Sequence, residues 1–163
     1  MSRRIEITLE TRGVSARATL LDDLAPRTSA AVWDSLPQAG DAWHAKYASN
    51  EVYALVPPLT PAPVGRENST LTPITGDLVY FDFPADQIPP AMRADLGLAD
   101  AGHFVDLAIF YGRNNLLLDP SSGFVPGNVF ATIDENLDAM VAACVDVWRN
   151  GFAGERLRFA RVD

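Results

Sequence analysis

The chain has 163 residues, of which 48% are hydrophobic, so it can form one folded unit with a substantial apolar core. Its formal net charge of −8 at pH 7 argues against nucleic acid as a partner, because phosphate binding needs a basic surface. The single cysteine, Cys144, excludes an intramolecular disulfide and a cysteine-based metal cluster, and no segment reaches the roughly 18 to 20 apolar residues of a membrane span. We therefore expect a cytoplasmic protein without a membrane partner, a metal or a cofactor.

The first part of the chain reads as two hairpins separated by a helix. Residues 4–10 and 14–21 alternate apolar and polar side chains, which predicts a β-hairpin. Residues 22–37 predict a helix with acceptors at its start, Asp22 and Asp23, and a proline at its end. Its buried stripe would be Leu24, Thr28, Ala31, Val32 and Leu36. Residues 41–48 and 51–57 then predict a second hairpin around a two-residue turn, Ser49-Asn50.

Two irregular insertions interrupt the middle of the chain. Residues 57–75 hold five of the twelve prolines, and proline cannot continue a central strand, so this segment is expected to be a long loop. A strand over 76–84 precedes the second insertion, residues 84–103, in which residues 90–97 predict a short helix. Strands are expected at 103–112 and 128–134.

The last helix has the clearest pattern. Asn136 is a candidate cap at its start, Gly151 can end it, and residues 155–162 close the chain as a strand. Its apolar stripe is predicted to be Leu137, Met140, Val141, Cys144 and Trp148. With eight or nine strands and two substantial helices, the sequence predicts a mainly β protein. We expect a mostly antiparallel, closed barrel over residues 1–163, with the two helices covering its ends.

The order of these elements resembles that of the cyclophilins. The helix opening Ala25-Pro26-Arg27-Thr28 is similar to the Ala-Pro-Lys-Thr helix of that family, and Asn128-Val129-Phe130-Ala131 resembles its Val-Phe-Gly-Lys segment. The stretches GDLVYFDFP, AIFYGRN and GNVFATID look closer still to bacterial cyclophilin-like proteins known only as a domain of unknown function. The resemblance covers nearly the whole chain except the insertions near 57–75 and 84–103, and it implies a cyclophilin-like barrel of about eight strands.

The resemblance does not extend to the isomerase chemistry. Cyclophilin isomerases carry a catalytic arginine in a Phe-His-Arg motif, and this chain has Trp43-His44-Ala45 at the matching place. The methyl group of Ala45 has no hydrogen to donate to a proline carbonyl. The glutamine of the isomerases' Ser-Gln-Phe-Phe motif is also missing from the strand that ends in Tyr111. We therefore expect no appreciable prolyl isomerase activity.

Three side chains on the predicted second hairpin are candidates for a ligand pocket. His44 is a titratable group near neutral pH, and Glu51 and Tyr53 would share its face if the strand register allows. Together they would offer acid-base and hydrogen-bonding groups. The alternatives are a histidine packed on the sheet, a glutamate at a strand start and a tyrosine at a sheet rim, all of which are ordinary.

The stretch LAIFYGRNN has two interpretations. Tyr111 followed by Arg113 and Asn114 can form the edge of a carboxylate-binding site, because a planar guanidinium beside aromatic rings suits that ligand. Alternatively, Gly112 and the asparagines simply end a strand in a turn, since these residues tolerate positive φ.

These candidates lead to three functional hypotheses. The first is binding of a small carboxylate-bearing ligand or a peptide in a pocket formed by His44, Glu51, Tyr53, Tyr111, Arg113 and Asn114. The second is an enzyme, either a residual isomerase or one that uses His44 as acid-base group on a small metabolite. The third is an accessory protein that forms homo-oligomers through the loop 57–75.

Overall fold

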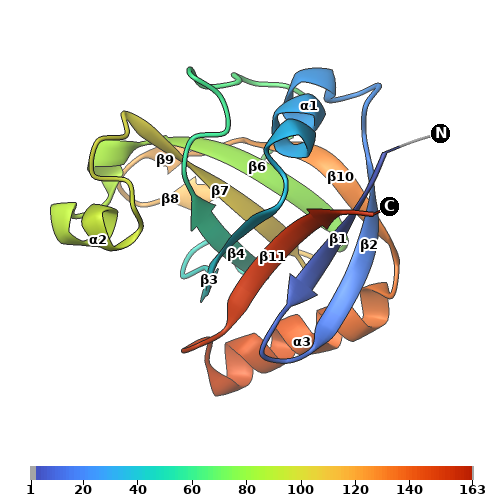
Figure 1. Ribbon diagram of the computed structural model, residues 1–163. Coiled ribbons are helices and arrows are strands. Elements are labelled where there is room, and N and C mark those ends of the chain that lie inside the picture. Colours follow the sequence, from blue (N-terminus) through green and yellow to red (C-terminus); the bar gives the residue numbers. More distant parts are fainter. Residues whose placement is uncertain (1–2, 163) are drawn as a thin grey trace.

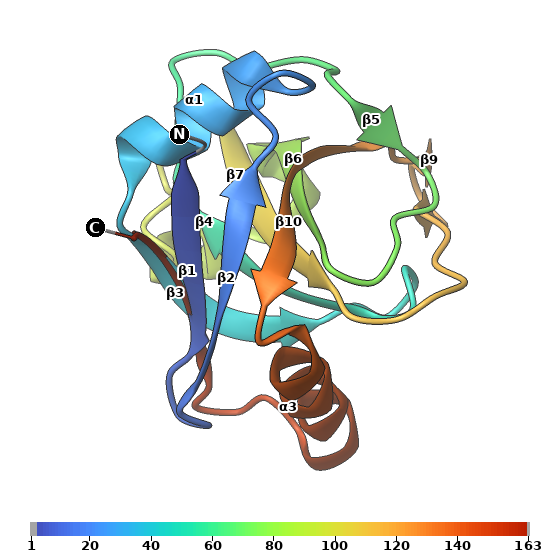
Figure 2. The same ribbon diagram turned by 90° about the vertical axis from the view of Figure 1, so that its right-hand side faces the viewer.

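A closed antiparallel β-barrel forms the centre of the computed structural model, which describes residues 3–162 (Figure 1). Within those residues nine strands form one sheet, and eight of them close into the barrel because β10 pairs with β2 as well as with β6. Figure 2 shows β10 and β2 side by side. In barrel order the strands are β2 (Val14–Leu20), β1 (Arg4–Leu9), β11 (Arg156–Arg161), β3 (Gln38–His44), β4 (Glu51–Val56), β7 (His103–Phe110), β6 (Asp77–Pro84) and β10 (Gly127–Glu135).

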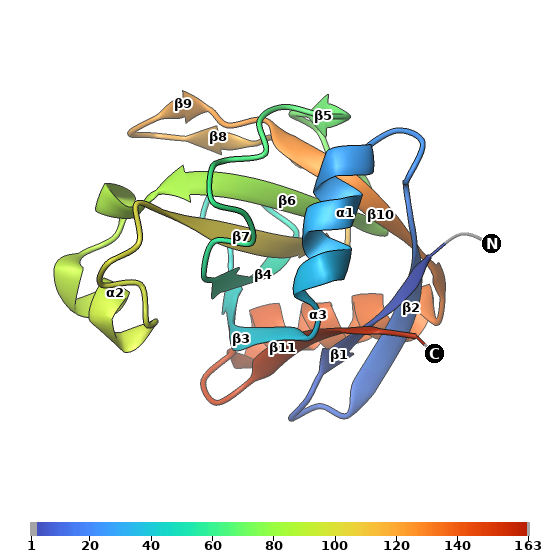
Figure 3. The ribbon, with the colours of Figure 1, turned by 45° about the horizontal axis from the view of Figure 1, so that its top comes forward.

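Two helices cover the ends of the barrel. Helix α1 (Pro26–Ser35) lies across one end and α3 (Leu137–Asn150) across the other, as Figures 1 and 3 show. The smaller elements lie on the side of the barrel: β5 (Ser69–Thr70), η1 (Ala85–Gln87), α2 (Pro90–Asp95), and the hairpin of β8 (Leu118–Asp119) and β9 (Gly123–Phe124). The predicted mainly β barrel with two covering helices is confirmed. Within the described residues no helix combines the length and apolar character needed to cross a membrane.

The barrel interior is the main core, and it follows the alternation in the sequence. Ile5, Ile7 and Leu9 on β1 point inward and are fully buried, as are Leu157 and Phe159 on β11. Neighbouring strands pair these residues directly, for example Ile7 with Phe159. Directly opposed residues lie on the same face, so the apolar sets of successive strands meet in one core.

Helix α3 is rotated relative to the predicted stripe. The buried residues are Met140, Ala143, Cys144 and Val147. Trp148, predicted to be buried, is 65% exposed, so that prediction is wrong. One residue turns an α-helix by about 100°, so the burial of Val147 directs Trp148 away from the barrel. Gly151 ends the helix with φ 94°, as expected, but the Asn136 side chain donates to the Ser15 carbonyl and does not cap the helix.

The proline-rich loop is attached to the barrel by its polar residues. Asp22 and Asp23 were expected to cap α1, but the acceptor at its start is Glu67, whose carboxylate accepts from the Thr28 amide at 2.7 Å and from the Thr28 hydroxyl at 2.8 Å. The side chain of Asn128 accepts from the Glu67 amide and donates to the Gly65 carbonyl. Four members of the predicted α1 stripe are buried: Thr28, Ala31, Val32 and Leu36. Leu24 precedes the helix and is exposed.

The outer face of β4, β7, β6 and β10 carries a second apolar layer. Its buried residues are Val79, Phe81, Ala108, Phe110, Leu117 and Val129, and the segment that contains the β8–β9 hairpin contributes Leu117 to it. Strand β7 is therefore buried on both faces from Phe104 to Phe110. The candidate site lies in this outer layer, where the hairpin leaves part of the sheet uncovered.

Candidate functional site

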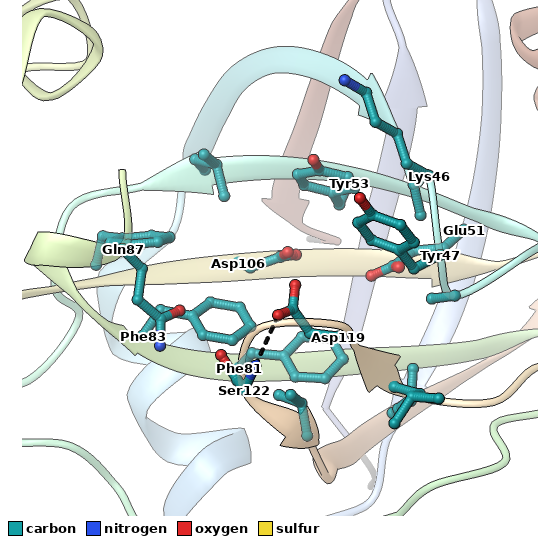
Figure 4. A pocket seen from close by; sticks show the side chains of 17 residues that line it. Lys46, Tyr47, Glu51, Tyr53, Phe81, Phe83, Gln87, Asp106, Asp119 and Ser122 are labelled. Atoms are coloured by element: carbon teal, nitrogen blue, oxygen red, sulfur yellow. Dashed lines mark hydrogen bonds between the residues drawn. The ribbon is translucent and has the colours of Figure 1, made fainter. Parts of the chain in front are cut away.

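The outer layer contains a cavity of about 210 Å³, which we call the outer-face cavity (Figure 4). Strands β4, β7 and β6 form its floor, the segment 45–48 and the hairpin form its walls, and Gln87 of η1 lies at one end. The lining is largely aromatic and apolar: Tyr47, Tyr53, Leu55, Phe81, Phe83, Phe104, Leu117 and Val125. Phe81 and Phe83 stack with ring centroids 5.6 Å apart.

Two carboxyl groups, Glu51 on β4 and Asp106 on β7, open into this cavity (Figure 4). The register pairs Glu51 with Phe110 and Asp106 with Leu55, so both side chains lie on the outer face with Tyr53 between them in the ladder. Each residue is only 6% exposed. Within residues 3–162 no hydrogen-bond donor reaches either carboxyl group, and Oδ1 of Asp106 is buried without a partner.

Burial governs the ionisation of these groups. It raises the pKa of Glu51 to about 8. The pKa of Asp106 is also raised well above its ordinary value, by burial and by the nearby Glu51 charge. Burial and the same two carboxylates raise the pKa of the Tyr53 hydroxyl. In a low-dielectric cavity two neighbouring carboxylates do not both ionise at neutral pH, so the pair retains protons that it can exchange with a ligand.

A third buried carboxyl group, that of Glu155, has a different environment. Glu155 is 1% exposed, and its oxygens accept from the backbone amides of Thr11 and Arg156 and from the Arg12 guanidinium, at 2.8 to 2.9 Å. Burial alone would raise its pKa, but these hydrogen bonds outweigh burial and lower it. The Glu155 carboxylate is thus surrounded by donors, whereas Glu51 and Asp106 have no donor among residues 3–162 and line the outer-face cavity.

The predicted grouping of His44 with Glu51 and Tyr53 is wrong, because the strand register separates them. His44 pairs with Val52, and Trp43 pairs with Tyr53. Val52 lies in the interior core, so His44 shares the inner face, while Glu51 and Tyr53 face outward. His44 is also the last residue of β3 rather than a mid-strand residue, because residues 45–50 connect the two strands.

His44 and Tyr111 do come together, but inside the barrel. Nδ1 of His44 donates to the Ala45 carbonyl at 2.9 Å, which leaves Nε2 to accept from the Tyr111 hydroxyl at 2.6 Å. Burial lowers the pKa of His44, so the neutral ring is favoured. Both ring nitrogens are satisfied within the protein, which matches the alternative of a packed histidine.

Arg113 and Asn114 lie in a turn and do not line the outer-face cavity. Both are exposed, and Asn114 has φ 63°, the left-handed conformation expected of asparagine in a turn. The neighbouring Asn115 holds the turn: it is 3% exposed, accepts from the Asn50 amide, and donates to the carbonyls of Pro73 and Gly112. The structure therefore favours the turn interpretation of this stretch.

Asp106 is the site residue that sequence reasoning missed. It lies in the strand HFVDLAIF, whose other members after the first are all apolar. An acidic residue inside a strand buried on both faces is itself a signal, because an unpaired buried charge is unfavourable. Phe81 and Phe83, which form much of the cavity floor, gave no such signal because aromatic residues are common in strands.

A second cavity of about 350 Å³ adjoins the first, and the two share Phe81, Phe83, Gln87, Ser122 and Val125. Its acidic group, Asp82, already accepts hydrogen bonds from the Val64 amide and the Tyr80 hydroxyl. Among the described residues, no three carboxylate, imidazole or thiol groups come together as a candidate metal site.

Comparison with known proteins gives a family but no activity. The sequence model of a protein family of unknown function, DUF3830, matches residues 7–159. The chain belongs to the DUF3830 family. No curated protein matches the sequence. The expectation of a family known only as a domain of unknown function is therefore confirmed.

Among solved structures, McbB in complex with tryptophan is similar to this DUF3830 chain, with a TM-score of 0.64 and 18% sequence identity. The match covers 96% of this chain and 44% of the McbB chain, so the DUF3830 chain corresponds to less than half of that protein. At this identity the likeness shows a shared fold.

Proposed function

We propose that this protein binds a small ligand with a one- or two-ring apolar body in the outer-face cavity, and that Glu51 and Asp106 hold the ligand's polar group. The observation that carries this proposal is Asp106, whose Oδ1 is buried without a partner among the described residues, together with a second buried carboxyl group, Glu51, in a cavity lined by aromatic rings. Buried polar groups in folded proteins are normally hydrogen-bonded, and exceptions cluster at functional sites. A ligand would provide the missing partners.

The size of the cavity supports a small ligand. An apolar cavity of about 150 Å³ accepts benzene, and pockets for drug-sized ligands span about 300 to 1,000 Å³. At about 210 Å³ the outer-face cavity lies between these values. The bound tryptophan of McbB, a protein of similar fold, is a two-ring molecule and lends this class further support.

A ligand held through its carboxylate by Arg113 is less well supported, because Arg113 lies in an exposed turn. Among the described residues lining the outer-face cavity, the one basic side chain is the exposed Lys46. In the accessory-protein hypothesis, the loop 57–75 would present its surface to a second copy while Glu67 and Asn128 attach it to the rest of the fold.

An acid-base enzyme is the second candidate, and the pKa of about 8 at Glu51 favours it. A carboxylic acid with a pKa near neutrality can donate a proton and take it back, so Glu51 and Asp106 replace His44 as the proposed acid-base groups. Prolyl isomerase activity stays excluded from this proposal. Ala45 lines the cavity but has no group that could polarise a proline carbonyl.

The test is a thermal-shift titration with tryptophol, an uncharged indole alcohol. A ligand that binds only the folded state stabilises it by about 2.7 kcal/mol at a concentration 100 times its Kd, so Tm should rise. Ser122→Trp should fill the cavity and remove the shift. The matched control is Phe124→Trp on the same hairpin, because the Phe124 side chain is exposed and is not part of the outer-face cavity lining. An unchanged shift in Ser122→Trp would place the ligand elsewhere.

A further inference from the structure

The charged groups that face the outer-face cavity are predominantly acidic. They come from three strands around it: Glu51 from β4, Asp106 from β7 and Asp119 from β8. The phenols of Tyr47 and Tyr53 line the same space. Asp119 accepts from the hydroxyl and amide of Ser121 and from the amide of Ser122, which lowers its pKa and keeps it ionised. The exposed Lys46 at the rim is the only basic lining residue among those described. The cavity therefore presents three carboxyl groups to a ligand, and its one basic lining residue within the described chain lies at the exposed rim.

We propose that the ligand carries an ammonium group that lies between Glu51 and Asp106 and takes the place of a proton held by this pair. This inference rests on the proposed function and names the chemical class of its ligand, an aromatic or otherwise apolar amine.

An ammonium group meets the needs of this site better than a neutral donor. It has three N–H donors and no acceptor, and the carboxylate that forms when one acid of the pair ionises is an acceptor only. Hydrogen bonds between ionised partners are roughly twice as strong as neutral ones. The rings of Phe81 and Tyr53, which line the same space, can also attract a cation through their faces.

The exchange balances in charge and atoms. The ammonium ion enters with its positive charge, one carboxylic acid of the pair ionises, and its proton leaves to the solvent, so the net charge of the cavity does not change. No covalent bond to the ligand forms or breaks. Tyr53 stays protonated because its pKa is raised, and Asp119 is already ionised, so neither supplies the proton.

The exchange predicts a direction of pH dependence. Because the pKa of Glu51 is raised to about 8, a proton must be removed below that pH before the ammonium can pair with a carboxylate. Affinity for an amine should then rise with pH, by up to about tenfold per unit, and level off above about pH 8. A carboxylate ligand would need the protonated acids as donors, so its affinity would fall over the same range.

The experiment is isothermal titration calorimetry of the full chain with three indole probes of similar size. Tryptamine is cationic, tryptophol neutral and indole-3-propionate anionic. Between pH 6 and 7 tryptamine should bind roughly tenfold more tightly, while the affinity of tryptophol stays constant. At pH 7, titrations in phosphate and Tris, which differ in ionisation enthalpy, should show release of about one proton per tryptamine bound.

Two isosteric variants, Glu51→Gln and Asp106→Asn, should each weaken tryptamine binding at least tenfold and weaken tryptophol binding by a clearly smaller factor. Asp138→Asn, at an exposed position on α3, is the same kind of acid-to-amide substitution and should leave both affinities unchanged. If a variant does not fold, the pH and buffer series on the unmodified chain still tests whether an ammonium ion replaces a proton of the pair.

The outcomes separate the two proposals. Tryptophol binding without any advantage for tryptamine, or without proton release, would overturn the ammonium inference alone. Tightest binding of indole-3-propionate at low pH would also overturn it, in favour of an anionic ligand. If none of the three probes binds, both the proposed function and this inference fail.

Discussion

The Tyr111 hydroxyl lies 2.6 Å from Nε2 of His44 on the inner side of the barrel, and the outer-face cavity lies on the opposite side of the same sheet. Tyr111→Phe leaves Nε2 without its donor, so the free energy of unfolding should fall by about 1 to 3 kcal/mol. Urea denaturation measures this loss. The affinity for tryptophol should not change. If Tyr111→Phe instead binds tryptophol more weakly and keeps its stability, Tyr111 and His44 belong to the ligand site.

The raised pKa of Glu51 should make the free energy of unfolding fall as pH rises. The neutral variant Glu51→Gln should lack this dependence. The side chain is protonated in both states below about pH 4.5; as pH rises to about 8, the unfolded chain loses this proton and the folded chain keeps it. Rising pH therefore favours unfolding over this window. The stability of Glu51→Gln relative to the unmodified chain should increase between pH 5 and 8 by up to about 1.4 kcal/mol per unit. Parallel stability curves from urea denaturation at these pH values would contradict the raised pKa.

The same substitution at Glu155 should have the opposite effect. Its pKa is lowered, so its contribution to stability is present above the unfolded value of about 4.5 and is lost as pH falls. At pH 7, Glu155→Gln weakens several charged hydrogen bonds and should lower the free energy of unfolding by about 1.5 to 3 kcal/mol. Equal effects of the two glutamine variants at pH 7 would show that donors do not distinguish these carboxyl groups.

Helix α3 offers a test of which face packs on the barrel. Met140 is fully buried, so Met140→Ala should lower the free energy of unfolding by about 2 to 5 kcal/mol. Trp148 is largely exposed, and Trp148→Ala should change it by no more than about 0.5 kcal/mol. Chemical denaturation of both variants measures these changes. A larger loss of unfolding free energy for Trp148→Ala than for Met140→Ala would show that the face predicted from the sequence is the buried one.

The turn after Tyr111 should depend on Asn115 and not on Arg113. Asn115→Ala removes one acceptor and two donors from buried partners, so a loss of about 2 to 3 kcal/mol is expected. Arg113→Ala should change neither stability nor the affinity for indole-3-propionate. A drop in that affinity would show that the guanidinium contacts an anionic ligand.

The sequence by itself determined most of the architecture. Alternation at Ile5 and Ile7 and at Leu157 and Phe159 predicts strands with one buried face, because this pattern depends only on the local period of two. The prolines of 57–75 predict an irregular segment for an equally local reason, the missing backbone donor. Strand and helix counts then limit the fold to a mainly β barrel with covered ends.

Which residues form the site depends on contacts between segments that are far apart in the sequence. His44 and Glu51 lie on opposite faces because β3 pairs with β4 in a register that places His44 opposite Val52, and a shift of one residue would have reversed this. The sequence of β7 has no alternating pattern that would indicate which way Asp106 points. The strand is covered on its inner side by the core and on its outer side by the hairpin region. Which side of a strand is buried, and which carboxyl group is left without a donor, depends on what packs against it. That information exists only once the barrel has closed.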